Sequence, residues 1–358
     1  MERTPEQVLV YGYFPKYDVL KEMTMMAFSG STAESVNIYI DITRMVANLY
    51  GPSVKILHPL SIASTILNLC AHLRTYYDVF HKVDTKFFLV YSDMSNEYNS
   101  RLIPEYNMGA LKRAEANIVT TNAISIAMNA LKELVPYLPG IYFKQDIHEP
   151  MAVIYDMIKY ESSMGNNEPN IIITKDPLVY QVPAMLDNTA IFRDNKYSGT
   201  FSSVTKNNVI VGYLHDTDRR KSLEDPNFMA KVSQISPELL GTIITLTNVP
   251  SRNVKSLQDI NKAVNTLYRI ISQGQILNGY VNDTNYLYSC IFNGLSKVGL
   301  ETFVLRYKAI DLISNWLYYI QTPYTKDRSY RIDLNDPETV QAINNEYFKD
   351  TPIDLNRL

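Results

Sequence analysis

Three short hydrophobic runs in this chain each end at an aspartate. They are VNIYID at 36–41, FFLVYSD at 87–93 and IIITKD at 171–176. β-Branched and aromatic residues fill them with little polar alternation, which is typical of strands buried on both faces of a parallel sheet. Open α/β sheets place their ligands at the carboxyl ends of the strands. We therefore expect Asp41, Asp93 and Asp176 to share one edge of a sheet and to form a site for a hard cation.

Helical periodicity alternates with these strands. Helices are predicted at 60–82, 109–134 and 150–160, and short strands at 140–143, 190–193 and 209–212. Pro150 stands where a first helical residue is expected, and Pro136 follows the second helix. The β-α-β order predicts an α/β fold, with a mostly parallel central sheet and helices on both faces.

The character of the chain changes after about residue 225. The triplet Ser236-Pro237-Glu238 is typical of a helix start, with a capping serine and a proline in the first turn. Further helical patterns follow at 257–272, 284–295 and 302–319. The predicted organisation is an α/β domain at 1–225, a helical region at 226–325 and a polar tail at 326–358.

Composition narrows the classes of function. The net charge of -3 gives no global basic field, so nucleic-acid binding would need a local patch. Cys70 and Cys290 are too few for a disulfide framework or a thiolate zinc site, which favours a reducing, cytoplasmic location. No segment approaches about eighteen uncharged apolar residues, so no membrane span is expected, and the first residues lack the pattern of a signal peptide.

The 27 tyrosines against one tryptophan, with many asparagines and isoleucines, suggest an AT-rich coding genome. A large bacteriophage fits this composition. The expected location would then be the cytoplasm of the infected bacterial host cell.

Five short motifs follow one another along residues 36 to 272. After the Asp41 run come YSD at 91–93 with the loop RLIPEYN at 101–107, then EPMA at 149–152, DPLVYQ at 176–181 and LTNVPSRNV at 246–254. Their kind and order resemble those of the 5'-3' exonuclease and flap-endonuclease family. The resemblance implies a PIN-like α/β fold related to the flap endonucleases, followed by a helix-hairpin-helix-like element.

The resemblance is incomplete at the acidic positions. Where the family has an acidic quartet opening a helix, only Glu149 remains. In the motif Asp-x-Asp-Leu-x-Gln, Leu178 replaces the second aspartate. In the hairpin that grips duplex phosphates, Val249 and Arg252 stand at the two aspartate positions, so this hairpin is degenerate.

The resemblance implies a remnant catalytic metal site. Its ligands would be Asp41, Asp93, Glu149 and Asp176, with Asp146 as a further candidate. Hydrolysis by two metals needs carboxylates that hold both ions about 3.5–4 Å apart, and only Asp176 is left for the second ion. We therefore expect either no metal or a single Mg²⁺ or Mn²⁺ that retains several waters.

Residues that could contact nucleic acid or a protein partner are found in three segments. They are Arg101, Tyr106, Lys112, Arg113, Arg252 and Asn253.

The residues of the predicted metal site can also have simpler structural roles. A strand-end aspartate is a common cap or turn former, Glu149 can favour the amino end of a helix through the helix dipole, and His148 is more often hydrogen-bonded than a metal ligand.

Two functions are consistent with these observations. The first is a catalytically degenerate nuclease-fold protein that acts as a binding adaptor, preferably for other proteins and alternatively for nucleic acid, in phage replication or in selective import of proteins into a phage nucleus. The second is an active, divergent, Mg-dependent 5'-3' exonuclease or flap endonuclease on DNA. The missing acids favour the first, and the four retained acids favour the second. A plain nucleic-acid-binding protein is disfavoured by the lack of basic composition. We favour the adaptor.

Overall fold

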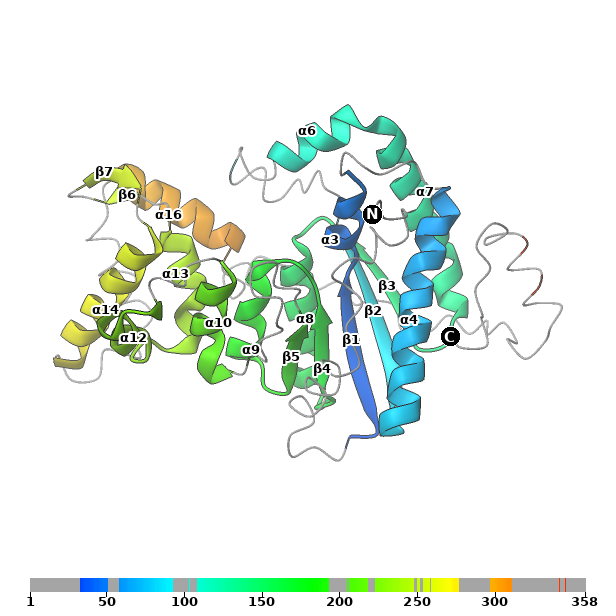
Figure 1. Cartoon of the computed structure of the whole chain (residues 1–358), viewed down its shortest axis with the longest axis horizontal. Helices are drawn as coiled ribbons and strands as arrows, with labels where there is room; N and C mark the ends of the chain where they lie inside the picture. Colours follow the sequence, from blue (N-terminus) through cyan, green and yellow to red (C-terminus); the bar gives the residue numbers. More distant parts are fainter. Residues whose placement is uncertain are drawn as a thin grey trace.

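The computed structural model describes residues 33–50, 58–92, 103, 108–192, 204, 206–217, 223–247, 250–251, 254–257, 259–276, 297–310, 341 and 345. A parallel sheet with helices on both faces forms one part of the molecule, and a group of helices lies beyond the β5 edge of that sheet (Figure 1). This confirms the predicted α/β fold.

The sheet has five strands, all parallel. They are β1 (Ser35–Asp41), β2 (Asp84–Ser92), β3 (Ile141–Asp146), β4 (Asn170–Ile173) and β5 (Thr189–Phe192). Their order is β3-β2-β1-β4-β5, so the direction in which strands are added reverses at β1. The carboxyl ends of β1 and β4 therefore flank a topological switch point, which is where open α/β sheets place their ligands.

One face of the sheet is covered by helices that follow β1 and β2 in the chain. They are α3 (Ile42–Val46), the 3₁₀ helix η1 (Ala47–Tyr50), α4 (Pro59–His81) and α7 (Ile118–Leu134), and α6 (Met108–Ala116) precedes α7 in the chain. Ile38, Ile40 and Ile171 of the strands pack with α4 and α7 in one apolar cluster. The predicted helix at 109–134 is two helices, because Asn117 has non-helical φ −126° and ψ 56°. The α6 helix extends away from the sheet (Figure 1).

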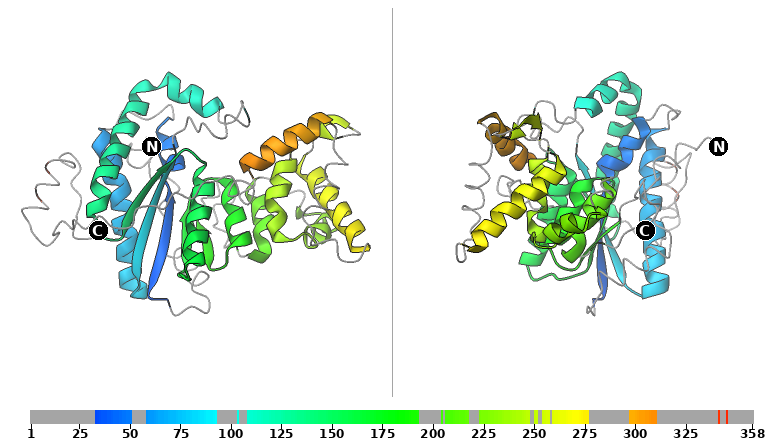
Figure 2. Two further views of the ribbon diagram at one scale, coloured as in Figure 1. Left: turned by 180° about the vertical axis from the view of Figure 1, so that it is seen from behind. Right: turned by 60° about the vertical axis from the view of Figure 1, so that its left-hand side comes forward.

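The opposite face is covered by elements that follow β3, β4 and β5. They are α8 (Pro150–Ser163), the 3₁₀ helix η3 (Pro177–Tyr180), α9 (Gln181–Met185) and α10 (Val209–Asp216). The rings of Tyr39 and Phe88 stack across neighbouring strands at 4.7 Å, and those of Phe88 and Tyr142 at 5.0 Å. Figure 2 shows the two helical layers on either side of the sheet.

The strand predicted at 209–212 is wrong, because these residues belong to α10. A short apolar run does not distinguish a strand from a buried helix. The helix continues through the buried residues Tyr213 and Leu214. A Cβ on Gly212 would lie 3.0 Å from the Tyr180 ring, so the small residue lets α10 pack closely against η3.

The remaining elements lie mainly in the helical region. They are η2 (Val135–Tyr137), η4 (Lys206–Asn208), α12 (Pro226–Val232), η5 (Pro237–Leu239), α13 (Leu240–Leu246), β6 (Pro250–Ser251), β7 (Val254–Leu257), α14 (Ile260–Ile276) and α16 (Lys297–Ile310). The apolar cluster that contains Tyr39 continues to Ile243 and Phe303, so the sheet and these helices share a core. None of the helices in the described part of the chain is long and apolar enough to cross a membrane.

The helix start predicted at Ser236 differs in detail. A 3₁₀ turn, η5, comes first, and α13 begins at Leu240. The Ser236 hydroxyl donates to the Glu238 carboxylate and makes no capping hydrogen bond. The helix predicted at 257–272 is confirmed from Ile260 onward as α14, whereas Leu257 ends β7. The helix predicted at 302–319 overlaps α16, and the segment 284–295 lies outside the described residues.

Candidate functional site at the carboxyl edge of the sheet

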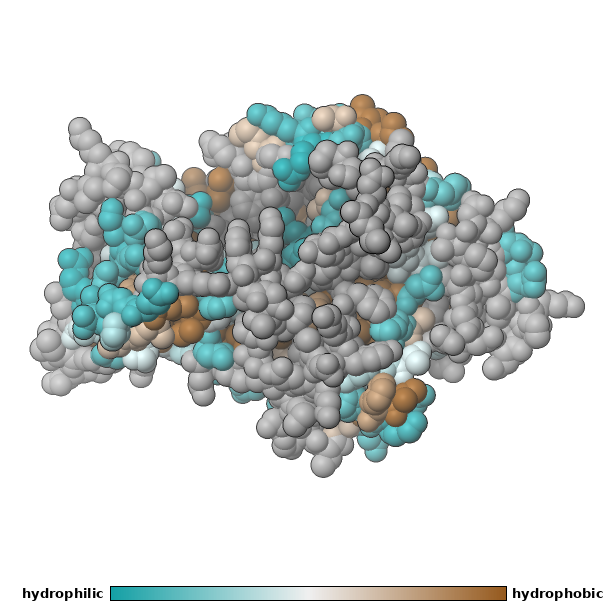
Figure 3. Space-filling view, viewed as in Figure 1, coloured by the Kyte–Doolittle hydropathy of each residue, from teal (hydrophilic) through white to brown (hydrophobic). Residues whose placement is uncertain are grey.

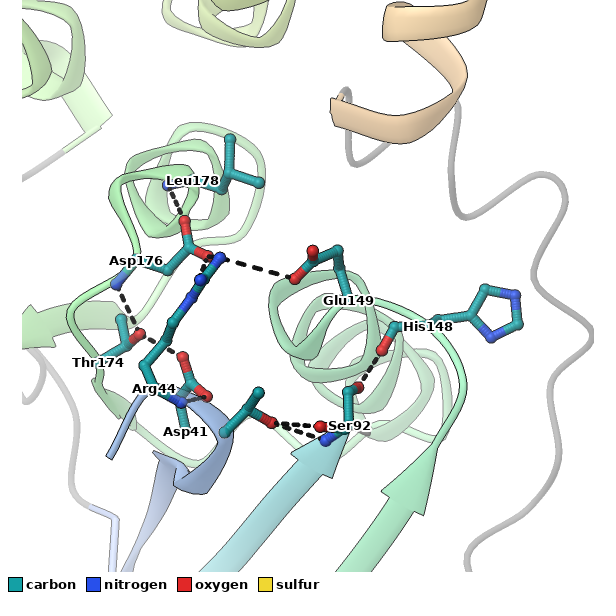
Figure 4. Close-up of polar contacts among 9 residues, drawn as sticks. Asp41, Arg44, Ser92, His148, Glu149, Thr174, Asp176 and Leu178 are labelled. Atoms are coloured by element: carbon teal, nitrogen blue, oxygen red, sulfur yellow. Dashed lines mark hydrogen bonds and ion pairs between the residues drawn. The ribbon is translucent and has the colours of Figure 1, made fainter. Parts of the chain in front are cut away.

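Three of the predicted site carboxylates meet at the carboxyl edge of the sheet (Figure 4). Asp41 ends β1, Glu149 directly precedes α8, and Asp176 follows β4. The exposed fractions of these residues are 0%, 2% and 2%. Asp93 follows the last residue of β2 in the sequence and lies outside the described residues. The expectation that strand-end aspartates converge is thus confirmed for Asp41 and Asp176.

Arg44, which belongs to none of the sequence motifs, lies among these carboxylates. Its Nη2 and Nε atoms lie 2.7 Å and 3.1 Å from Asp176 Oδ2, and Nη2 lies 3.9 Å from Glu149 Oε2. Figure 4 shows the guanidinium between the two acids. Asp176 makes the largest contribution to raising the pKa of Arg44 well above its usual value, so the guanidinium stays charged.

Asp41 joins the ends of β1 and β4. It caps α3, with Oδ1 accepting from the Arg44 backbone N–H at 3.0 Å, and its Oδ2 accepts from Thr174 Oγ1 at 2.7 Å. Thr174 Oγ1 in turn accepts from the Asp176 N–H at 2.9 Å. Burial raises the pKa of Asp41 to about 7, although the positive charge of Arg44 acts in the opposite direction.

Asp176 uses both carboxylate oxygens in protein contacts. Oδ2 pairs with Arg44, while Oδ1 accepts from the Leu178 backbone N–H at 2.8 Å and caps η3. The Leu178 side chain packs into the apolar cluster on the α8 face of the sheet, so only its backbone reaches the carboxylate. The capping role that the sequence left open is therefore confirmed for Asp41 and Asp176.

Hydrogen bonds also hold the end of β2 at this edge. Thr43 Oγ1 accepts from the Ser92 N–H at 2.6 Å and lies 3.2 Å from the Ser92 carbonyl oxygen, to which it can donate. The Ser92 hydroxyl donates to the His148 carbonyl oxygen. These contacts tie the last residue of β2 to α3 and to the loop before α8.

Asp146 and His148 form a separate pair at the end of β3. His148 Nδ1 lies 2.8 Å from Asp146 Oδ1, which also accepts from the backbone N–H groups of Ile147 and His148. Lys144 Nζ lies 3.4 Å from Asp146 Oδ2. The Asp146 carboxylate thus folds back on its own loop, and Figure 4 shows the His148 ring pointing away from Arg44.

The other predicted contact residues are only partly placed. Lys112 and Arg113 are exposed on α6. The rest lie outside the described residues: Arg101, Tyr106, Arg252 and Asn253. Within the described ranges, which exclude Asp93, no three His, Cys, Asp or Glu side chains are grouped as a metal site would require.

Comparison of the chain with protein-family models, with curated proteins and with solved structures gave no match. The resemblance to flap endonucleases therefore rests on the sequence motifs. The structure shows an all-parallel sheet with Asp41, Glu149 and Asp176 at its carboxyl edge.

Proposed function

We propose that this chain is a catalytically degenerate protein of the flap-endonuclease type that acts as a binding adaptor, with other proteins as its preferred partners. The observation that carries this proposal is the ion pair between Arg44 and Asp176 at 2.7 Å. A carboxylate that serves a metal directs its lone pairs at the ion, whereas those of Asp176 are directed at a guanidinium and at the start of η3.

The chemistry of phosphodiester hydrolysis supports the same proposal. Two-metal catalysis requires several carboxylates around two divalent ions, and loss of even one ligand removes most of the rate. Leu178 supplies an apolar side chain where the resemblance requires an aspartate, and that side chain is in the core. A guanidinium a few ångströms away repels a divalent ion strongly, since the residues around it are buried.

An exposed apolar surface on α7 supports the proposal that the partner is a protein. On α7 the side chains of Ile118, Val119 and Ile126 are 64%, 58% and 51% exposed. Figure 3 shows hydrophobic surface above the junction of α6 and α7. Exposed apolar patches of this kind mark surfaces that bind proteins. If a phage encodes the chain, the setting we propose is the infected bacterial cytoplasm, in replication or in selective import of proteins into a phage nucleus.

One observation favours the second function, an active divergent 5'-3' exonuclease or flap endonuclease that uses a single Mg²⁺ or Mn²⁺. Asp41, Glu149 and Asp176 lie at the same carboxyl edge of the sheet, next to its switch point, where open α/β sheets place their ligands. In that case the metal ion would displace the Arg44 guanidinium when it binds.

A cleavage assay separates the two functions. Wild-type protein and an Asp41→Ala/Asp93→Ala variant are incubated with 5'-labelled duplex and flap DNA in Mg²⁺ or Mn²⁺. We expect no cleavage by either protein, and metal-dependent cleavage by the wild type alone would contradict the adaptor function.

A capture experiment tests the partner class. Proteins retained by the wild type from the natural host cell are compared with those retained by an Ile118→Lys/Val119→Lys variant. Ser162→Lys, at an exposed polar position of α8 on the opposite face of the sheet, is the matched control. We expect a specific protein to be lost only from the double variant. Retention of DNA at low salt, with no protein lost from the double variant, would favour a nucleic-acid partner instead.

A further inference from the structure

The carboxyl edge of the sheet holds three buried acids, Asp41, Glu149 and Asp176, and one partly exposed base, Arg44. Asp41, Glu149 and Asp176 are at most 2% exposed. Their shared cation is Arg44, which contacts Asp176 and Glu149 through its guanidinium and Asp41 through its backbone N–H. Carboxylates gathered in this way repel one another unless a positive charge or protonation compensates them.

We propose that the Arg44 guanidinium is the resident cation of this edge, in the place where a divalent ion would bind, and that removing it exposes a divalent-cation site formed by Asp41, Glu149 and Asp176. The inference deepens the proposed function, because it names the residue that keeps metal out. It concerns ion binding by the chain itself, and its test uses no DNA.

The anchoring of Arg44 explains why the guanidinium stays in place. Its backbone lies in the first turn of α3, where Asp41 accepts its N–H at 3.0 Å. Its side chain reaches across to β4 and binds the Asp176 carboxylate through both Nε and Nη2. Both ends of the residue are therefore held by acids of the cluster, and an arriving ion has to displace a charged group that is already hydrogen-bonded.

The oxygen donors left after truncation would suit a hard cation. Two aspartates and a glutamate are the ligands that Mg²⁺ and Mn²⁺ prefer, and waters complete the coordination shell. The Arg44 side chain is 33% exposed, so the space it leaves would open to solvent and admit a partly hydrated ion. Leu178 adds no donor to this set, because its side chain lies in the core.

Mn²⁺ binding measured by electron paramagnetic resonance tests the proposal directly. We expect Arg44→Ala to bind about one Mn²⁺ per chain at least about tenfold more tightly than the wild type, because the repelling charge is gone. We expect Mn²⁺ to raise the melting temperature of this variant by about 5 °C or more and to leave that of the wild type unchanged.

Three variants serve as controls. Arg44→Lys keeps the positive charge and should bind Mn²⁺ no better than the wild type. Asp176→Asn in the Arg44→Ala background should abolish the gained site. Arg74→Ala removes an arginine whose hydrogen bonds go to Thr85 and the Pro139 carbonyl oxygen, and should gain no site.

Circular dichroism establishes whether the variants fold, and Arg44→Gln provides a second, larger neutral replacement. Folding of either variant only in the presence of Mn²⁺ would support the proposal. It would be overturned if folded Arg44→Ala bound Mn²⁺ no better than the wild type, if the lysine variant bound it equally well, or if neither neutral variant folded even with Mn²⁺. Cleavage of DNA by the wild type would overturn the proposed function, and is scored in a separate assay.

Discussion

The two edges of the sheet use charge in different ways. At the amino edge Glu168 accepts from Lys86 Nζ at 2.7 Å and 2.9 Å, and from the Ser35 hydroxyl, with side-chain exposures of 37% for Lys86 and 21% for Glu168. One acid there meets one base near solvent. At the carboxyl edge three buried acids share Arg44.

The two edges therefore differ in the electrostatic cost of their charges. A half-exposed pair of one acid and one base is an ordinary surface contact that joins neighbouring segments. Three buried carboxylates around one guanidinium exceed what the fold needs, since a surplus of buried like charges is destabilising. Departures of this kind from local rules are concentrated at functional sites.

The largest effect is expected from breaking the carboxyl edge. Asp176→Ala removes the partner of Arg44 and the cap of η3, so we expect the free energy of unfolding to fall by about 3–5 kcal/mol. Urea unfolding followed by circular dichroism measures this change. Asp187→Ala, an exposed aspartate at the next loop, is the matched control and should change stability by less than about 0.5 kcal/mol. Equal losses of stability from the two substitutions would show that the buried contacts of Asp176 contribute no more than an exposed aspartate does.

The pH dependence of stability tests the burial of Asp41. Its folded pKa of about 7 is above the usual 3.8, so between these values the folded protein holds a proton that the unfolded chain has released. The free energy of unfolding contributed by this group therefore falls as pH rises from about 4 to about 7. Asparagine cannot ionise, so Asp41→Asn should lose this slope, a difference of about 3 kcal/mol between pH 5 and pH 8. Parallel profiles of stability against pH for the two proteins would contradict the raised pKa of Asp41.

A smaller effect is expected at the amino edge. Glu168→Gln removes the charge that pairs with Lys86, and because this pair is partly exposed we expect a loss of less than about 1 kcal/mol. The loss should shrink as salt is added, whereas that of Asp176→Ala should persist. Denaturation at low and high ionic strength measures both; a salt-independent loss above that of Asp176→Ala would reverse the comparison.

The smallest effect is expected away from both edges. Lys112 and Arg113 are exposed on α6. Their joint replacement by alanine should change the free energy of unfolding by less than about 0.5 kcal/mol, because exposed side chains without buried partners contribute little. Thermal melting followed by circular dichroism gives the answer, and a clear loss of stability would show that α6 is held in place by these charges.

The sheet was predictable because each strand carries its own signal. Runs such as 36–41 and 171–176 are apolar on both faces, as strands covered by helices must be. The run at 209–212 is also apolar, but it is helical. Its packing partners, among them Tyr180, come from other segments of the chain, so the local pattern does not identify them.

The site was predictable only in part for a similar reason. Strand-end aspartates share an edge in any parallel sheet, so Asp41 and Asp176 could be placed together. Arg44 could not, because its partner Asp176 lies 132 residues away and meets it only when β4 pairs with β1. The spacing of three residues from Asp41 was the one local signal, because it puts Arg44 one helical turn from the strand end.

We expect Arg44, and no divalent ion, to be the cation at the carboxyl edge of the wild-type protein. A crystal of the wild-type protein soaked in MnCl₂, with anomalous data collected above the manganese absorption edge, tests it most directly. We predict no anomalous peak at the carboxyl edge and density for the Arg44 guanidinium between Asp176 and Glu149. A peak coordinated by Asp41 and Asp176, with Arg44 displaced, would show that a divalent ion is the cation of this edge.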